Sequence, residues 1–481
     1  MKISFKILAV FFVILGMTSA CDLAELNENP NAPTRVEAAS LLANAQNNLS
    51  DLYWGRALSF EFGMLMVQHL SQNEYASESR YQITPDAFDG SWNSWYSSPL
   101  MDIMEAKKIV ESQRESQGDA VTNNRLATLT IMEVFAMQAI TDMWGDVPYS
   151  EAFRISEITS PAYDTQESVY DQLITNLNTA ISSITPTAAG FTEGDNIYDG
   201  NMAMWEKFGN SLKLRIAMRI SDKDANRAST LASEAIAGGV LTSNAEAPYY
   251  VFGADQRIAN PWHLDAKVAP VRDDFCISKT LTDSMELYND PRLPFFAEEN
   301  IDGNIVGMPY GLSDGDAFAL KSVSSRPSDV LREATAPAKW MTYAEVLFLE
   351  AEAIERGFVS GVAADKFNDA IMASMAEWGV DNADAVTYAT AKTAAYASKP
   401  WELVIGYEKW VSLYSNGLEA FAEWRRLDYP ALVPAPESVL DADEIPLRAQ
   451  YTNVEQSVNG TSVTNADQVD ELTARVWWDA K

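Results

Sequence analysis

Apolar residues recur at steps of three and four along most of this chain, and this spacing constrains the fold more than any other feature. Near the start, Leu42, Ala45, Leu49 and Leu52 follow one another at such steps, which predicts an amphipathic helix over residues 37–53. The same periodicity predicts further helices over 100–116, 123–143, 166–183, 202–221, 340–356, 362–377 and 401–427. The sequence therefore predicts an all-α fold.

The predicted helices come as neighbours joined by short loops, for example 340–356 with 362–377, where Gly357 is a good terminator of the first helix. Stacked helix pairs are the repeating unit of helical solenoids. We therefore predict a tetratricopeptide-like helix-pair solenoid, although the sequence contains no repeated tetratricopeptide consensus. Two long stretches, 241–276 and 289–338, are rich in Gly, Pro, Asp and Asn. Loops of this length are usually functional, so these stretches are predicted to be irregular segments that form the ligand face.

The first 21 residues have the pattern of a bacterial lipoprotein leader. Lys2 and Lys6 precede a short apolar run, and three small residues lead to Cys21. We predict a signal peptide over 1–20 and lipid attachment at Cys21. Thr18 stands where the strict lipobox prefers leucine, so ordinary cleavage that leaves a free Cys21 stays open.

Residues 21–36 lack apolar periodicity and contain Asn, Pro and Glu, which predicts an anchor and tether. The remaining residues, 37–481, show no shift in composition and are predicted to form a single binding domain. No later segment reaches the roughly 18 consecutive apolar residues that a membrane-spanning helix needs.

The charge of the chain excludes some classes of partner. With 68 acidic and 35 basic residues, the formal net charge is −33. Nucleic-acid binding requires clustered Lys and Arg, so we predict no nucleic-acid partner. A strongly negative surface also repels polyanionic glycans, which favours neutral sugars or peptides as ligands.

Searches for a catalytic centre give weak candidates only. Ser313 lies in a G-x-S-x-G pattern, but the nucleophile elbow needs a later histidine, and both His69 and His263 come earlier. The pattern is therefore interpreted as a glycine loop. Two histidines and no nucleophile motif predict that the protein is not an enzyme. A surface-anchored glycoside hydrolase remains the alternative, because a pair of carboxylates cannot be recognised among so many acidic residues.

The metal candidates are also weak. Asp195, Asp199, Gly200 and Glu206 have part of the spacing of a calcium loop, but Ile197 occupies a ligand position. This stretch is interpreted as a structural turn before a helix. Asp314 and Asp316 in a glycine loop are ordinary. We predict no metal and no cofactor.

Aromatic residues provide the remaining signal for a ligand. Trp92, Trp95 and Tyr96 open a predicted helix, which favours packing over ligand binding. Aromatic residues in polar loops differ, because flat rings stack on the apolar faces of sugars while neighbouring polar groups bond the hydroxyls. Anchoring of the surface loops by the same residues is the alternative. The predicted ligand-binding residues are Tyr75, Arg80, Tyr81, Trp262 and His263.

Sequence motifs along nearly the whole mature chain resemble one family. They are Asn27-Glu-Asn-Pro-Asn-Ala-Pro-Thr34, Trp144-Gly-Asp-Val-Pro-Tyr-Ser-Glu151, Trp205 to Arg219, Asp290-Pro-Arg-Leu293, Glu345 to Ala353, Glu423-Trp-Arg-Arg-Leu427, Pro446-x-Arg448-x-x-Tyr451 with Glu455 and Asn459, and Arg475-Val-Trp-Trp-Asp479. In their order and number they resemble the SusD/RagB-like outer-membrane nutrient-binding lipoproteins, in the subgroup called SusD-like family two.

This resemblance implies a tetratricopeptide-like scaffold that acts as a lid over a SusC-like, TonB-dependent β-barrel transporter. The lid would capture an oligosaccharide or oligopeptide without chemical change. Arg215 and Arg219 would pair with helix carboxylates and not with ligand. Acidic residues after the cysteine, Asp22 and Glu25, resemble the surface-export signals of this group, although Asp22 would retain an enteric lipoprotein at the inner membrane. The implied location is the outer membrane, lipid-anchored and facing the exterior.

Overall fold

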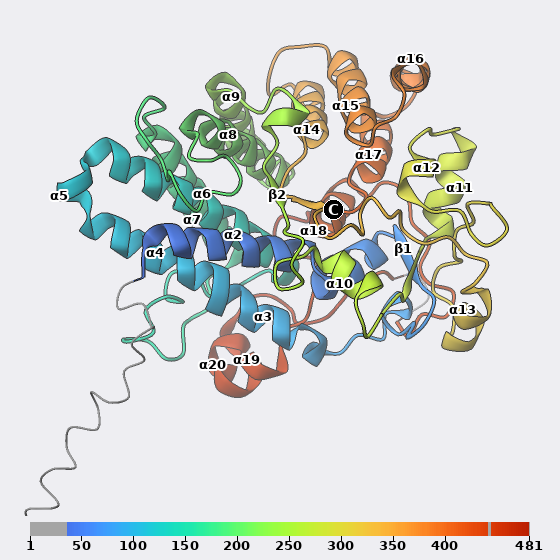
Figure 1. Ribbon diagram of the computed structural model, residues 1–481, viewed down its shortest axis with the longest axis horizontal. Helices are drawn as coiled ribbons and strands as arrows, with labels where there is room; N and C mark the ends of the chain where they lie inside the picture. Colours follow the sequence, from blue (N-terminus) through green and yellow to red (C-terminus); the bar gives the residue numbers. More distant parts are fainter. Residues whose placement is uncertain (1–35, 441–443, 481) are drawn as a thin grey trace, which may run out of the picture. The chain divides into compact units, whose positions relative to one another are not determined.

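Helices form most of the structure, as the apolar periodicity predicts (Figure 1). The computed structural model describes residues 36–440 and 444–480. Ala38–Lys481 form one compact unit. The predicted leader, Cys21 and nearly all of the tether lie outside the described residues, and the domain boundary at residue 37 stays a prediction.

Seven of the eight predicted helices are present with nearly the expected bounds. They are α2 (Ala38–Trp54), α4 (Met101–Ser112), α6 (Asp119–Trp144), α7 (Gln166–Ser183), α8 (Met202–Arg219), α14 (Tyr343–Glu355) and α15 (Ala363–Glu377). Side-chain caps explain several starts, because Thr165, Asn201 and Thr342 each accept a hydrogen bond from a backbone N–H in the first turn.

The prediction of one helix over 401–427 is wrong. The chain forms α17 (Trp401–Ser412) and α18 (Gly417–Leu427). Ser415 between them has a left-handed backbone, with φ of +81°, and the Asn416 side chain caps α18. The apolar period continues across this break, and so the spacing predicts a single helix. Two more helices, α9 (Ala225–Gly238) and α16 (Asn382–Tyr396), were not predicted, and each begins at a capping aspartate.

Consecutive helices pack side by side, as α6 with α7, α8 with α9, α14 with α15, and α15 with α16 (Figure 1). This pairing agrees with the predicted helix-pair scaffold, and its likeness to tetratricopeptide repeats stays a prediction. Within the described residues, α6 alone is long and apolar enough to cross a membrane, but 83% of its most apolar window is buried in the fold. We therefore treat α6 as a core helix.

The two long irregular segments are tied down by two short antiparallel sheets. Strand β1 (Leu70–Gln72) pairs with β3 (Phe275–Ile277), and β2 (Tyr249–Val251) pairs with β4 (Pro337–Lys339). Short helices lie within these segments, namely α10 (Pro261–Lys267), α12 (Leu293–Phe296) and α13 (Asp314–Leu320), and α11 (Lys279–Leu287) lies between them. The segments are thus ordered without forming long helices.

Buried ion pairs join the central helices. Arg215 Nε on α8 is 2.7 Å from Glu345 Oε1 on α14, and Arg219 Nη2 is 2.6 Å from Glu419 Oε2 on α18. Burial disfavours the charged guanidinium, but Glu419 and its carboxylate neighbours outweigh this effect and hold the pKa of Arg219 well above its usual value. The expected pairing of Arg215 and Arg219 with helix carboxylates is confirmed. These arginines position helices and lie away from solvent.

Candidate ligand-binding groove

Two of the five residues predicted to bind ligand are buried. The Tyr81 side chain is 1% exposed, and its hydroxyl accepts a hydrogen bond from the Ala435 N–H at 3.0 Å; burial raises its pKa to about 12. Trp262 is 4% exposed, and its ring centroid lies 3.9 Å from that of Phe60. A stacking platform needs an accessible ring face, so these two rings serve packing in this structure. Both residues lie in polar stretches of the sequence, but their side chains are buried in the core.

The other three predicted residues remain accessible but do not converge on one hollow. Tyr75 is 63% exposed. Arg80 is partly buried, and its Nε donates to the Ala76 carbonyl at 3.2 Å. His263 Nδ1 lies 3.0 Å from the Arg332 carbonyl, to which its N–H donates. Arg80 and His263 thus hold their loops, and a direct role in ligand binding stays a prediction for both.

The calcium-like stretch is a turn, as the sequence analysis favours. The Asp195 carboxylate accepts hydrogen bonds from the Gln46 side chain, the backbone N–H of Gly200 and the Trp205 indole at 2.7–2.9 Å. A carboxylate engaged by so many donors closes the turn before α8. Among the described residues, no group of three or more His, Cys, Asp or Glu side chains is arranged to hold a metal ion. Ser313 accepts from the Asp316 N–H and caps α13, so it is a helix cap.

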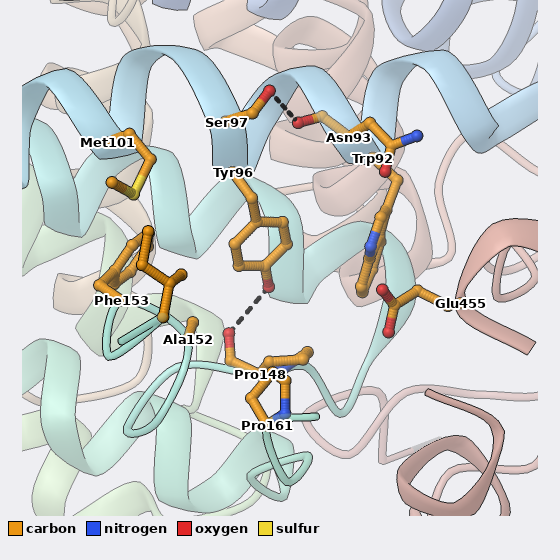
Figure 2. A pocket seen from close by; sticks show the side chains of 11 residues that line it. Trp92, Asn93, Tyr96, Ser97, Met101, Pro148, Ala152, Phe153, Pro161 and Glu455 are labelled. Atoms are coloured by element: carbon orange, nitrogen blue, oxygen red, sulfur yellow. Dashed lines mark hydrogen bonds between the residues drawn. The ribbon is translucent and has the colours of Figure 1, made fainter. Parts of the chain in front are cut away.

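A groove of about 470 Å³ lies beside α3 (Asp89–Trp95) and the π-helical turn η6 (Tyr96–Leu100) that continues it. Figure 2 shows Trp92 and Tyr96 pointing from this helix toward the wall that carries Pro148 and Pro161, while Phe153 lies below Met101 to one side of Tyr96. Its volume falls within the range of small-ligand sites. The lining residues are Trp92, Asn93, Tyr96, Ser97, Met101, Pro148, Ala152, Phe153, Ile155, Pro161 and Glu455.

The first wall is aromatic because Trp92 and Tyr96 are four residues apart on one helix face. Their ring centroids are 5.2 Å apart. Trp92 also packs at 5.1 Å against Trp144, which leaves it 3% exposed, so only an edge of its ring reaches the groove. Tyr96 is partly exposed, and its hydroxyl donates to the Pro148 carbonyl at 2.9 Å. Burial, and then the nearby Glu455 carboxylate, hold the pKa of Tyr96 well above its usual value, so the hydroxyl remains a donor.

The second wall is the loop from Val147 to Asp164. An antiparallel backbone bridge between these two residues closes the loop at its base. Asp164 Oδ2 accepts from the backbone N–H groups of Tyr149 and Ser150 at 3.0 and 2.8 Å. Between the closed ends, the loop carries Phe153, whose ring lies 6.2 Å from Tyr96, and Ile155, which is 66% exposed. The loop therefore presents apolar side chains from a fixed base.

One carboxylate lies at the end of the groove. Glu455 belongs to α19 (Asn453–Val458), and its Oε2 accepts from the Tyr163 hydroxyl at 3.0 Å and the Asn459 amide at 3.3 Å. Within the described part of the chain, its Oε1 accepts no hydrogen bond. Burial, and then the Glu455 charge, raise the pKa of Tyr163, which keeps that hydroxyl protonated as a donor. The groove combines apolar walls with one acceptor of fixed position.

The groove is not predicted from the sequence. Trp92 and Tyr96 were assigned to packing, which is correct for most of the Trp92 ring, and Phe153 was not considered. The three parts of the chain that line the groove, 92–101, 148–161 and residue 455, are far apart in sequence. A helix that carries aromatic residues four apart, with Asn93 and Ser97 exposed beside them, was the only local signal.

Comparisons with known proteins agree with this fold. A solved chitin-binding protein superposes with a TM-score of 0.80 at 26% identity, covering 92% of this chain and 100% of its own. A SusD homologue from Bacteroides uniformis gives 0.79 at 25% identity, covering 92% and 99%. A chitin-binding SusD homologue from Flavobacterium johnsoniae shares the fold, with 0.75 at 22% identity over 92% and 98%.

No curated protein sequence matches this chain. A sequence profile described as starch-binding and associating with the outer membrane matches residues 30–452, which is most of the chain. The chain therefore belongs to this SusD-like family.

Proposed function

We propose that this protein captures neutral oligosaccharides at the cell surface and delivers them to a SusC-like, TonB-dependent transporter in the outer membrane. The observation that carries the proposal is the groove between α3–η6 and the 147–164 loop in a chain of the SusD-like family. Aromatic and apolar walls suit the C–H faces of pyranose rings, and a few polar groups would orient the hydroxyls.

The polar groups at the groove favour a neutral ligand. Glu455 is the one carboxylate among the described residues that line it, and no Lys or Arg lines it. A free carboxylate oxygen accepts from sugar hydroxyls but repels uronates and sulfates. The net charge of −33 acts in the same direction.

Hydrolysis is disfavoured by the same lining. Glycoside hydrolases of the common type need two carboxylates on either side of the bond that breaks. One carboxylate lines the groove among the described residues, so binding without chemical change is the function that the geometry supports.

Native affinity electrophoresis of the mature protein against neutral and acidic polysaccharides tests the proposal, and chitin belongs in the panel because a relative binds it. We expect retardation by a neutral polymer, and recovery of that ligand uncleaved. Phe153→Ala and Glu455→Gln should weaken binding about tenfold, which corresponds to about 1.4 kcal/mol. The control Ile301→Ala, at an 82% exposed position away from the groove, should bind normally. Retardation by no polysaccharide, together with binding of oligopeptides, would contradict the proposal.

The anchor and the transporter need separate tests. Labelling of cells with a fatty-acid analogue should mark the wild-type protein, and Cys21→Ala should lose both the label and the membrane fraction. Firm anchoring requires more than one acyl chain. Co-purification of the lipidated protein with a β-barrel from the outer membrane would support delivery, and recovery without any barrel would count against it.

A further inference from the structure

Tyr75 is the most exposed aromatic side chain among the described residues, at 63%. Its backbone has φ of +52°, in the left-handed region that non-glycine residues rarely adopt. Such a conformation costs about 1 kcal/mol or more and persists when the surroundings hold it in place. An exposed ring on a constrained turn is unusual for a residue that only packs.

Three other segments hold this turn. The Asn73 N–H donates to the Asp274 carbonyl at 2.8 Å, and the Ala76 N–H donates to Asp314 Oδ1 at 2.6 Å. Glu74 forms an ion pair with Lys321 at 2.9 Å. Residues on both sides of Tyr75 are therefore fixed, and the direction of its side chain is set before any ligand arrives.

One face of the Tyr75 ring is already covered. The Arg272 guanidinium carbon lies 4.9 Å from the ring centroid. Arg272 is held in turn by Asp274, with Nε and Nη2 both within 2.9 Å of Oδ2. Within the described residues, neither the Tyr75 hydroxyl nor Arg272 Nη1 has a hydrogen-bond partner, and no other ring contacts Tyr75. The opposite ring face and the Tyr75 hydroxyl are therefore open to a ligand.

We propose that the Tyr75–Arg272 pair is a second glycan-binding subsite, outside the groove, at which one neutral pyranose ring stacks on the open face of Tyr75. The stacked guanidinium keeps the ring from turning, and the tyrosine hydroxyl donates to a hydroxyl of the stacked sugar. Arg272 shares Asp274 with Arg56, and Arg56 also pairs with Glu61 and Asp265, so this cluster has no excess positive charge and the subsite does not select anions. This inference rests on the proposed capture of glycans and adds a contact that only a chain longer than the groove reaches.

The test compares a polysaccharide that the wild-type protein binds with a short oligosaccharide of the same sugar, by isothermal titration calorimetry. Tyr75→Ala should weaken polymer binding about three- to tenfold, the effect of losing one stacking contact of about 0.7–1.4 kcal/mol. Its affinity for the short ligand should stay within about twofold. Tyr75→Phe keeps the stacking face and should retain most of the affinity. Tyr288→Ala is the matched control, because the ring of that partly exposed tyrosine is already occupied by Lys392 Nζ at 3.5 Å.

The outcomes separate this inference from the proposed function. Unchanged polymer affinity in Tyr75→Ala would overturn the subsite and leave the groove intact. Loss of polymer binding in Tyr75→Ala, with normal binding in Phe153→Ala, would support the subsite and overturn the groove. Absence of glycan binding in the wild-type protein would overturn both. Thermal melting shows whether each variant is folded.

Discussion

Arg426 on α18 and Glu352 on α14 form a bidentate ion pair in the core, with Nη1–Oε1 at 2.6 Å and Nη2–Oε2 at 2.5 Å. Both side chains are at most 1% exposed. Glu423 on α18 also contacts Arg426 at 2.7 Å. Burial opposes the charge on Glu352, but Arg426 outweighs it and keeps the pKa of this carboxyl below its usual value.

Glu352→Gln should therefore destabilise the fold by about 3–5 kcal/mol, since it leaves the Arg426 charge buried without its main partner. Chemical denaturation at neutral pH measures this loss. The control Glu105→Gln removes an exposed ion pair with Lys108 and should change the free energy of unfolding by less than about 0.5 kcal/mol. Equal effects of the two variants would show that the buried ion pair contributes no more to the free energy of unfolding than the exposed one.

Acid should destabilise the protein through His69, which is fully buried. Its Nε2–H donates to the Trp410 carbonyl at 2.9 Å, while Nδ1 has no hydrogen-bond partner among the residues that the structure describes. Burial lowers the pKa of His69 from 6.5 to about 3. The unfolded chain then binds a proton below pH 6.5 that the folded protein does not, so stability is full above pH 6.5 and falls toward pH 3.

The expected slope from His69 is about 1.4 kcal/mol per pH unit. It is best measured between pH 6.5 and 4.5 as the difference between the wild-type protein and His69→Gln, because burial raises the pKa of Glu61 and Glu345 and these carboxyls also bind protons as the pH falls. His69→Gln should lower the slope of the unfolding free energy against pH in this window by an amount that corresponds to about one bound proton. An unchanged slope in that variant would contradict the assignment.

Two glycines allow the π-helix η3 (Arg56–Met64) to lie directly against the start of α18. A Cβ on Gly63 would lie 2.4 Å from the Gly417 carbonyl oxygen, which is backbone and cannot turn away. We expect Gly63→Ala to destabilise the fold by at least about 1–3 kcal/mol, the usual effect of overpacking, as measured by thermal melting. Gly90→Ala, where the new Cβ would meet no described atom within 4 Å outside its own helix backbone and chain neighbours, should be neutral or slightly stabilising.

Asp164 should control both the order of the groove wall and the affinity for ligand. Asp164→Ala removes the carboxylate that accepts hydrogen bonds from the backbone N–H groups of Tyr149 and Ser150 and from the Ser150 hydroxyl. We expect faster cleavage within 150–162 by a protease and glycan binding weaker by about three- to tenfold, because the loop then pays more entropy on binding. Glu157→Ala, which removes an exposed ion pair with Arg154, should leave both measurements unchanged.

The sequence predicted the helical scaffold well, because apolar spacing reports the buried face of each helix directly. It joined α17 to α18 because the break depends on the left-handed Ser415 and the Asn416 cap, and neither interrupts the apolar period. Asp224 and Asp381 were cap signals that would have revealed α9 and α16.

The site was harder to predict. Polar neighbours suggested that Tyr81 and Trp262 were exposed, but tertiary contacts with Ala435 and Phe60 bury them. Tyr96, Phe153 and Glu455 meet only after folding, and no local pattern connects three residues that far apart. Tyr75 is exposed, as a ring that binds ligand must be, but its role in ligand binding stays a prediction, and its contact with Arg272 could not have been inferred from spacing.

The wall of the groove formed by residues 147–164 is closed at its base by a backbone bridge between Val147 and Asp164 and by the hydrogen bonds that the Asp164 carboxylate accepts. Insertions, deletions and substitutions between these ends would alter the groove while the ion-paired core stays the same. Relatives with this scaffold can therefore differ in ligand specificity through changes in one short segment. Similarity over the whole chain is then a poor guide to the ligand that each relative binds.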